Sequence, residues 1–269
     1  MKYSVACGAV TSERTPLLFG GDFCSSIKKA HTYGFDAIEI HTPDIEELDV
    51  QAIQKACRDN SVFISTLGTG TIYGKYGLYL MDQDEDRRNN LVERVKQFID
   101  VAAELGSKVT IGSIKGNVPK GENRDVYLDT MGKTLSVLSK YAGERGVKVL
   151  LEATNRFENN VINTAHDIVA MVEKYDLENV QGLLDSFHIN IEEKEMSRCI
   201  FEAGRYLGHI HFGDNVRTYP SSGSFLWDIF CGEIKASGYD GVLSVECFPV
   251  PTGEIAAEET MKFFRRYFG

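Results

Sequence analysis

A repeated unit of an amphipathic helix, a glycine and a short apolar run dominates the pattern of this chain. Its clearest copies place the glycine at Gly34, Gly106, Gly146 and Gly238. A glycine just after a helix suits the left-handed backbone conformation in which many helices end. The run that follows each glycine lacks polar alternation, which is typical of a parallel strand covered on both faces. The pattern therefore predicts helices that alternate with parallel strands.

Eight strands of this kind are predicted along the chain. They lie at residues 3–7, 36–40, 62–67, 107–111, 147–152, 180–185, 207–212 and 241–246. Helical patterns lie between them, for example at 84–105, where one face is apolar. Eight strands alternating with helices are typical of a (β/α)₈ TIM barrel. Because no linker or low-complexity stretch interrupts the chain, we expect residues 1–269 to form a single α/β barrel domain.

An open, doubly wound sheet is the structural alternative. That fold would predict a glycine-rich phosphate-binding turn directly after the first strand. The pair Gly20-Gly21 does not supply such a turn, so the barrel is the favoured architecture.

Four polar residues stand at the ends of the last four predicted strands. They are Glu152, Asp185, His211 and Glu246, in strand order. The carboxyl ends of all barrel strands meet at one mouth, so we expect these side chains to face one another. Each residue alone could be a helix cap or a core side chain. No clear helix start follows any of them directly, and a buried carboxylate is costly unless it is paired or holds a metal. Together they predict a metal site.

The chemistry of this set points to a hard cation. Three carboxylates and one imidazole favour Mn²⁺ or Mg²⁺ over a structural zinc ion, which takes Cys or more His ligands. We expect one divalent ion, with Mn²⁺ first and Mg²⁺, Co²⁺ and Zn²⁺ as alternatives. Water or substrate oxygens would complete its ligand shell, so the ion could polarise a carbonyl or hydroxyl group of a bound molecule.

Further polar residues follow the same strand ends. Glu158 follows the fifth strand, His188 the sixth and Arg217 the seventh, and Trp227 could form a wall of the pocket. Each has an alternative interpretation, because Arg217 and Glu158 could be solvated loop charges and His188 could accompany the start of the next helix. The segment 112–117 offers a polar loop that could bind an anion through Ser113, Lys115 and Asn117, or could be an ordinary polar turn.

Charge and cysteine usage narrow the class of protein. The formal net charge is −10 and no cluster of Lys and Arg stands out, which argues against a nucleic-acid partner. The six cysteines are scattered without a C-x-x-C motif and are expected to be reduced intracellular thiols. No segment has the pattern of a signal peptide or the length of a membrane span. We therefore expect a cytoplasmic protein with no membrane partner.

The strand ends and their neighbours resemble the xylose isomerase-like barrel superfamily of sugar (phosphate) isomerases and epimerases. Within it, the chain is most similar to the D-tagatose/D-psicose 3-epimerase group. The motifs that carry the resemblance are Glu152…Asn155-Arg156-Phe157-Glu158, Asp185-Ser186-Phe187-His188-Ile189-Asn190, His209-Ile210-His211-Phe212-Gly213-Asp214-Asn215-Val216-Arg217 and Ser244-Val245-Glu246. Three segments depart from that group: Pro220-Ser221-Ser222-Gly223 replaces Pro-Gly-x-Gly, and the loops at 8–21 and 68–74 differ.

The resemblance implies roles for individual residues. Glu152, Asp185, His211 and Glu246 would hold one divalent metal, usually Mn²⁺. The substrate would be bound near its reacting end by Glu158, His188 and Arg217. The partner would be a small-molecule sugar or sugar phosphate, and a homodimer or homotetramer would be usual.

The resemblance implies an epimerase that acts at C3 of a ketose, free or phosphorylated. A metal would stabilise the enediolate, while Glu152 and Glu246 act as the catalytic pair that removes and returns the proton. An aldose–ketose or inosose-type isomerase in the same barrel is the main alternative. A sugar-binding barrel without activity and a metal-dependent DNA-repair endonuclease are two others. The endonuclease would need more metal ligands and a basic face, which six histidines and a net charge of −10 do not supply.

Overall fold

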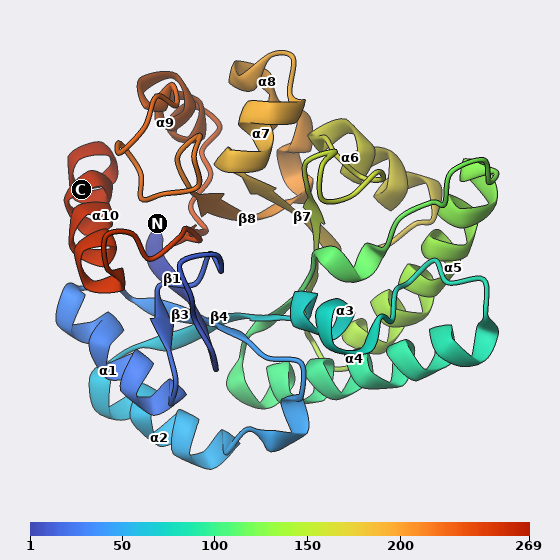
Figure 1. The fold of residues 1–269 in the computed structure, drawn as a ribbon, viewed down its shortest axis with the longest axis horizontal. Helices are drawn as coiled ribbons and strands as arrows, with labels where there is room; N and C mark the ends of the chain where they lie inside the picture. Colours follow the sequence, from blue (N-terminus) through green and yellow to red (C-terminus); the bar gives the residue numbers. More distant parts are fainter.

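The strands close into a ring surrounded by helices (Figure 1). The computed structural model describes residues 1–269. The ring contains β1 (Lys2–Gly8), β3 (Ala37–His41), β4 (Phe63–Gly68), β5 (Lys108–Ile111), β6 (Val149–Ala153), β7 (Val180–Asp185), β8 (Leu207–Phe212) and β9 (Val242–Val245). Neighbours pair in parallel and in chain order, and β1 also pairs with β9. This closure confirms the predicted (β/α)₈ barrel and excludes the open sheet.

One additional strand was not predicted. The short β2 (Phe19–Gly20) pairs in parallel with the end of β1, where Cys7 lies opposite Phe19 and Gly8 opposite Gly20. It belongs to the loop between β1 and the first helix. Two residues are too few to show a periodic pattern, so sequence periodicity could not reveal this strand.

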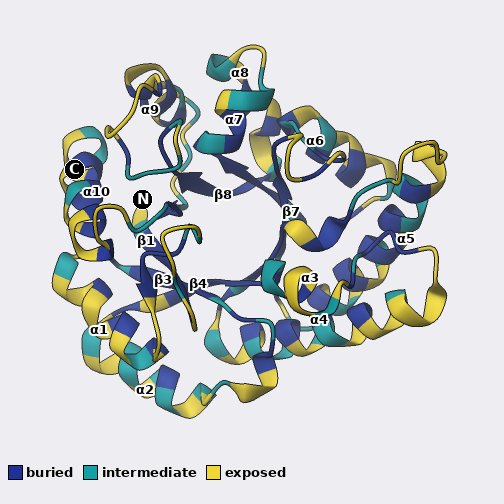
Figure 2. Cartoon of the chain, in the orientation of Figure 1, coloured by how far each residue is buried: buried dark blue, intermediate teal, exposed yellow.

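Helices cover the outside of the ring. The outer layer contains α1 (Phe23–Tyr33), α2 (Val50–Asn60), α4 (Glu85–Leu105), α5 (Arg124–Gly143), α6 (Ala165–Lys174), α8 (Met196–Ala203), α9 (Trp227–Ala236) and α10 (Gly253–Phe268). Two short helices, α3 (Gly70–Tyr76) and α7 (Ser186–Glu192), follow β4 and β7 almost directly, and 3₁₀ turns lie at η1 (Ile45–Glu47), η2 (Ser113–Lys115) and η3 (Gly204–Tyr206). Buried residues line the sides of the helices that face the ring (Figure 2). None of the helices is both long and apolar enough to cross a bilayer.

The glycines of the repeated unit have the predicted backbone conformation. The φ angles of Gly34, Gly106, Gly146 and Gly238 are 90°, 66°, 66° and 73°. In α4, for example, the N–H of Gly106 donates to the carbonyl of Ala102, so the helix ends and the chain turns into β5. These positions let each helix return the chain to the start of the next strand.

Polar side chains fill part of the barrel interior below the mouth. The hydroxyls of Ser4 and Ser65 lie 2.8 Å apart, and those of Thr66 and Thr110 lie 2.7 Å apart. Each is buried and partnered, as buried polar groups must be. The apolar core lies mainly outside the ring, between strands and helices, and this leaves the inside of the barrel for polar chemistry.

Candidate active site

The structure brings together the four side chains predicted to hold a metal. Glu152 lies in β6, Asp185 ends β7, His211 lies in β8 and Glu246 directly follows β9. One ligand atom from each residue lies within 4.8 Å of the ligand atoms of the other three, and all four residues are buried. These strands are neighbours in the ring, so their carboxyl ends bring the four residues to one side of the mouth.

Two atoms of this cluster are buried without a hydrogen-bond partner. They are Oδ2 of Asp185 and Nδ1 of His211. Nδ1 of His211 lies 3.7 Å from an oxygen of Glu246 and 4.0 Å from an oxygen of Glu152. Unpaired buried polar atoms are costly, and a divalent cation between these donors would satisfy both. The set of three carboxylates and one imidazole therefore fits a hard divalent ion.

Asp185 has a second role that the sequence interpretation missed. We expected no helix directly after it, but α7 begins at Ser186 and Asp185 is its N-cap, so that expectation was wrong. One oxygen of Asp185 accepts a 2.8 Å hydrogen bond from the backbone N–H of Phe187. The other oxygen is the unpartnered one. The cap therefore fixes the carboxylate so that its free oxygen remains available to the cluster.

Glu39 is a buried carboxylate bonded to the cluster that the sequence interpretation did not single out. It lies in β3, is fully buried, and accepts hydrogen bonds from Nε2 of His209 at 2.7 Å and from Nε2 of His211 at 3.1 Å. Because Nε2 of His211 donates to this carboxylate, its Nδ1 is the ring nitrogen that faces the cluster and that would supply a lone pair to a metal ion. The only sequence signal was a single acid inside the apolar run 37–40.

Replacing Glu39 with glutamine is expected to weaken Mn²⁺ binding by about 10- to 100-fold, because the amide no longer fixes the orientation and tautomer of His211. Isothermal titration of metal-free protein measures this change. Glu193→Gln, which alters a half-buried carboxylate outside the cluster, is the matched control. Equal Mn²⁺ affinities for Glu39→Gln and the control would contradict the assigned role of Glu39.

The pKa values of the cluster reflect burial and crowding of charge. Burial, together with the neighbouring Glu246, raises the pKa of Glu152 to about 8. Burial also raises the pKa of Asp185, to about 6, against the opposing effect of Arg217. Burial alone would lower the pKa of His211, but Glu39 and Glu246 raise it to about 10. Without a cation, protons therefore neutralise part of this cluster.

The three residues predicted to bind substrate lie around the cluster. Nδ1 of His188 accepts a 2.8 Å hydrogen bond from the side-chain amide of Asn155, and its Nε2 lies 3.7 Å from Glu152 and 3.8 Å from Asp185. Burial lowers the pKa of His188 well below its usual value, so the ring is neutral and Nε2 carries the proton. His188 can therefore donate a hydrogen bond beside the metal cluster.

Arg217 connects the cluster to the third of these residues. Its guanidinium donates to Glu246 at 2.8 Å and to Glu158 at 3.1 Å, and it lies over the ring of Phe187. Burial alone would lower the pKa of Arg217, but Glu246 leads a set of carboxylates that raise it. The positive charge is therefore fixed at the edge of the cluster.

A cavity of about 220 Å³ opens onto these residues. Its lining residues include Glu152, Glu158, His188, His211, Arg217 and Glu246, together with Thr15, His41, Thr69, Thr71 and Ser113. Trp227 does not form a wall of this cavity, contrary to our suggestion. Its ring instead stacks on Phe212 with centroids 5.5 Å apart. The cavity is therefore polar, and most of its non-charged groups are hydroxyls and backbone.

Of the three polar residues proposed for an anion-binding loop at 112–117, only Ser113 lines this cavity. Lys115 is fully buried and donates to the carbonyl of Glu152 at 2.7 Å and to the hydroxyl of Thr154 at 3.2 Å. Asn117 accepts from the N–H of Asn160 at 2.7 Å. The side chains of Lys115 and Asn117 are therefore both bonded within the protein.

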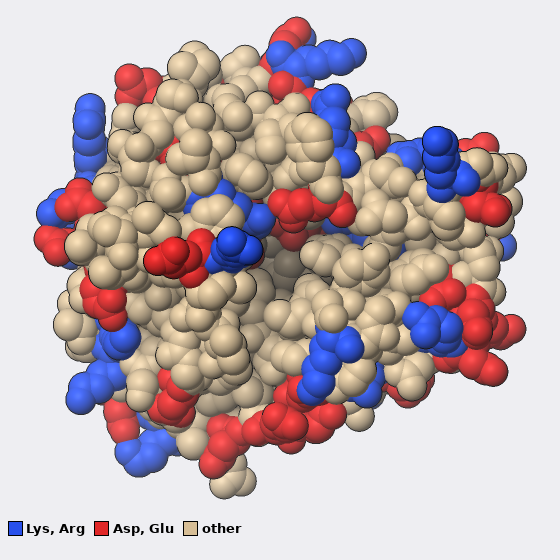
Figure 3. All heavy atoms as spheres, viewed as in Figure 1, with Lys and Arg blue, Asp and Glu red and all other residues tan.

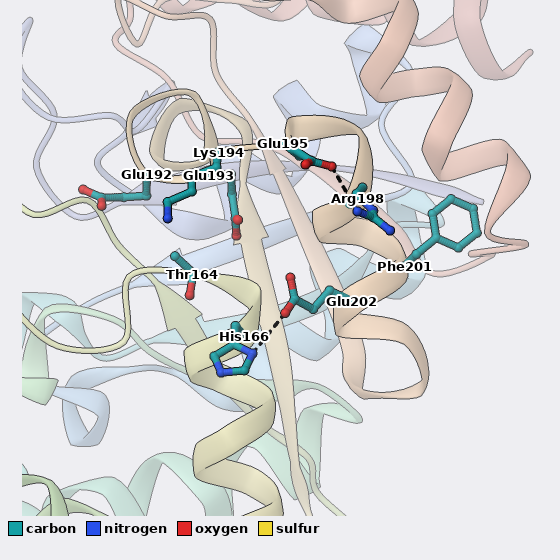
Figure 4. A pocket seen from close by; sticks show the side chains of 9 residues that line it. All are labelled: Thr164, His166, Glu192, Glu193, Lys194, Glu195, Arg198, Phe201 and Glu202. Atoms are coloured by element: carbon teal, nitrogen blue, oxygen red, sulfur yellow. Dashed lines mark hydrogen bonds and ion pairs between the residues drawn. The ribbon is translucent and has the colours of Figure 1, made fainter.

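A larger cavity, of about 760 Å³, lies elsewhere, between α6 and the α7–α8 segment. Figure 4 shows its charged side chains, with His166 paired to Glu202 and Glu195 to Arg198. None of the seven predicted site residues lines it. Size alone therefore does not identify the functional site, which is defined by the cluster of buried donors.

Comparison with known proteins gives one consistent result. Residues 27–267 match the family described as xylose isomerase-like TIM barrel. The chain is 31% identical over 237 residues to a D-psicose 3-epimerase of Ruminiclostridium cellulolyticum, covering 84% of this chain and 78% of that protein. It is 27% identical over 240 residues to a 3-dehydro-D-guloside 4-epimerase of Escherichia coli (strain K12), covering 86% and 87%. The fold matches a crystal structure of D-psicose 3-epimerase with D-tagatose from Clostridium cellulolyticum H10, with a TM-score of 0.87, 24% identity and 99% coverage of both chains.

Proposed function

Because the chain belongs to the xylose isomerase-like TIM barrel family, we propose that it is a divalent-metal-dependent ketose 3-epimerase. Its relatives are sugar epimerases, so the chain is an enzyme of the isomerase class. One observation carries the finer proposal: Glu152 and Glu246 line the same cavity and both belong to the cluster that fits a metal ion. Proton transfer at a carbon next to a carbonyl uses groups that exchange the proton, here two carboxylates, and a positive charge that stabilises the carbonyl oxygen, here a cation.

A divalent ion, for which we propose Mn²⁺, would be held by Glu152, Asp185, His211 and Glu246 and would supply positive charge beside the substrate oxygens. Epimerisation removes the proton from the carbon next to the ketone and returns a proton to its opposite face. In the ring, β7 and β8 separate β6 from β9, so Glu152 and Glu246 stand at the two ends of the row of four cluster residues. One of the two groups takes the proton as an ionised carboxylate, and the other, which begins the step as a carboxylic acid, gives its proton to the opposite face of the resulting enediolate.

Neighbouring donors would stabilise the negative charge that develops during this transfer. The Nε2–H of neutral His188 and the guanidinium of Arg217 both border the cavity. Fixed donors aimed at developing charge lower the barrier because they need no reorganisation during the reaction. Glu158 orients this arrangement, since it accepts from Arg217 and from Asn155.

The lining of the cavity favours an unphosphorylated sugar. Arg217 is the only Lys or Arg among the 18 lining residues, and two carboxylates already hold its guanidinium. A phosphate group would find no free cation. We therefore expect kcat/KM for a free ketohexose to exceed that for its 6-phosphate by about 10- to 100-fold. Steady-state kinetics on matched pairs measures the ratio, and a preference for the phosphate ester would contradict this assignment.

A 4-epimerase acting on a 3-keto sugar is the second candidate. The observation that favours it is the similarity to the 3-dehydro-D-guloside 4-epimerase, which covers 86% of this chain. The same two carboxylates could serve either reaction, because each epimerises a carbon beside a ketone. A nucleic-acid substrate is disfavoured, since Lys and Arg are interspersed with Asp and Glu on the face in Figure 3 and form no basic patch there.

Incubation of Mn²⁺-loaded protein with free ketoses and 3-keto sugars in D₂O, followed by NMR, tests the proposal. Deuterium at C3 together with the C3 epimer is the expected result. Deuterium at C4 of a 3-keto sugar would support the second candidate, and an aldose product would identify an aldose–ketose isomerase. Sugar binding without any exchange would indicate a sugar-binding barrel and overturn the proposal.

A further inference from the structure

One buried carboxylate close to the candidate site has no role in the mechanism above. Asp214 follows β8, is fully buried, and does not line the cavity. Its Oδ1 accepts hydrogen bonds from the backbone N–H of Asn215 at 2.8 Å and of Phe225 at 3.1 Å. Its Oδ2 accepts from the N–H of Ser221 at 2.9 Å and from the indole of Trp227 at 2.8 Å. Four donors on one buried carboxylate form a satisfied and strong network.

These donors come from positions throughout the connection between β8 and α9. Backbone hydrogen bonds stabilise the same loop conformation. The N–H of Asp214 donates to the carbonyl of Thr218, and the N–H of Arg217 donates to the carbonyl of Asp214. A Cβ at Gly223 would lie 2.4 Å from Oδ1 of Asp214, so the chain approaches the carboxylate as closely as glycine allows. The loop at 214–227 is therefore folded around the Asp214 side chain.

Arg217 lies within this loop and depends on its shape. Its φ angle is 58°, a left-handed conformation that is uncommon for residues other than glycine. Its carbonyl accepts from the N–H of Phe248 at 2.7 Å, which ties the loop to the segment that follows Glu246. The guanidinium then reaches Glu246 and Glu158. An unusual backbone conformation persists only where the surrounding contacts impose it.

We propose that Asp214 is a positioning residue that sets the conformation of the β8–α9 loop and thereby places the guanidinium of Arg217 against Glu246. The role of Arg217 in catalysis rests on the proposed function. The positioning of its side chain by Asp214 does not, so the two can be tested separately.

Asp214→Asn replaces one acceptor oxygen with an NH₂ group that faces two N–H donors. We expect kcat/KM to fall on the order of 100-fold, because a small displacement of a charged group in an active site is that costly. The rates are compared at saturating Mn²⁺, and full Mn²⁺ occupancy is expected to be retained because Asp214 touches none of the four ligands. Asp82→Asn is the matched control: Asp82 is also buried and accepts a backbone N–H within a loop, but it does not line the cavity. An equal loss in both variants would overturn the proposal.

A double-mutant cycle with Arg217→Ala separates positioning from general destabilisation. If Asp214 acts through Arg217, Asp214→Asn has no further effect on kcat/KM once Arg217 is alanine. Additive losses would overturn the proposal. Should Asp214→Asn fail to fold, Trp227→Phe removes one of the four hydrogen bonds and retains Asp214. Its smaller loss in kcat/KM should likewise disappear in the Arg217→Ala background.

Two readouts need no enzymatic activity. Trp227 is the only tryptophan in the chain, so the protein's tryptophan fluorescence reports on the hydrogen bond from its indole to Asp214. A shifted emission in Asp214→Asn would show that the hydrogen bonds around residue 214 have changed. The Nε–H of Arg217 is buried, and ¹⁵N NMR should show it protected from exchange in wild-type protein and exposed in Asp214→Asn. If no sugar reacts, the proposed function fails. If the tryptophan emission of Asp214→Asn shifts but the Nε–H of Arg217 stays protected from exchange, the positioning role of Asp214 is overturned.

Discussion

Substitution of Glu152 or Glu246 by glutamine is expected to lower kcat for epimerisation by about 100- to 10,000-fold. Glutamine keeps the size and one oxygen of each side chain but cannot accept a proton at physiological pH. Both residues line the cavity, so each substitution removes one of the two groups placed to exchange a proton with the substrate. Steady-state rates with a ketose and with its C3 epimer measure the loss.

Isotope exchange provides the sharper form of this test. A variant that retains one carboxylate can still remove the proton from one epimer and return a deuteron to the same face, without inversion. We therefore expect Glu152→Gln to exchange the C3 proton of only one epimer in D₂O, and Glu246→Gln that of the other. This complementary pattern would assign a face of the substrate to each carboxylate.

Loss of metal must be separated from loss of a base, because both residues belong to the candidate cluster. The Mn²⁺ content of each variant is therefore measured by atomic absorption before the kinetics. Glu193→Gln changes a half-buried carboxylate outside the cavity and should retain wild-type rates. Near-wild-type epimerisation by both cluster variants, with metal bound, would refute the two-carboxylate mechanism.

The strand-end residues could be predicted from the sequence because their placement follows from topology. Once alternating helices and apolar runs indicate a barrel, a polar residue at the end of each run must lie at the common mouth. Glu152, Asp185, His211 and Glu246 come together for this reason, and no side-chain detail was needed. The same argument gave strand positions that agree with the structure to within one or two residues at most boundaries.

Contacts between side chains of strands that are not neighbours, and contacts within loops, could not be predicted from the topology. Glu39 and His211 lie 172 positions apart, and they meet because closure of the ring leaves only β1 and β9 between β3 and β8. Lys115 and Trp227 looked like surface or pocket residues, yet each is buried and donates to a nearby acceptor. Such pairings depend on strand register and loop conformation, which a single sequence does not reveal.

Removal of the metal is expected to abolish activity and to make rebinding strongly dependent on pH. In the metal-free protein, Glu39 and Glu246 raise the pKa of His211 to about 10 despite its burial, and burial raises that of Glu152 to about 8. At pH 7 both groups therefore carry protons that an incoming cation must displace. Since fewer protons compete as the pH rises, Mn²⁺ affinity should increase from pH 6 to pH 8.

Calorimetric titration of Mn²⁺ in buffers of different ionisation enthalpy measures how many protons the protein releases when it binds the ion. We expect between about one and two protons per ion at pH 7. Bound Mn²⁺ should also stabilise the fold, by about 2.7 kcal/mol at a free concentration 100 times Kd. The variant His211→Ala is the control, because it lacks the more basic of the two groups and should release fewer protons. Activity that survives complete chelation, or an affinity that is flat between pH 6 and pH 8, would show that these four side chains do not form the metal site.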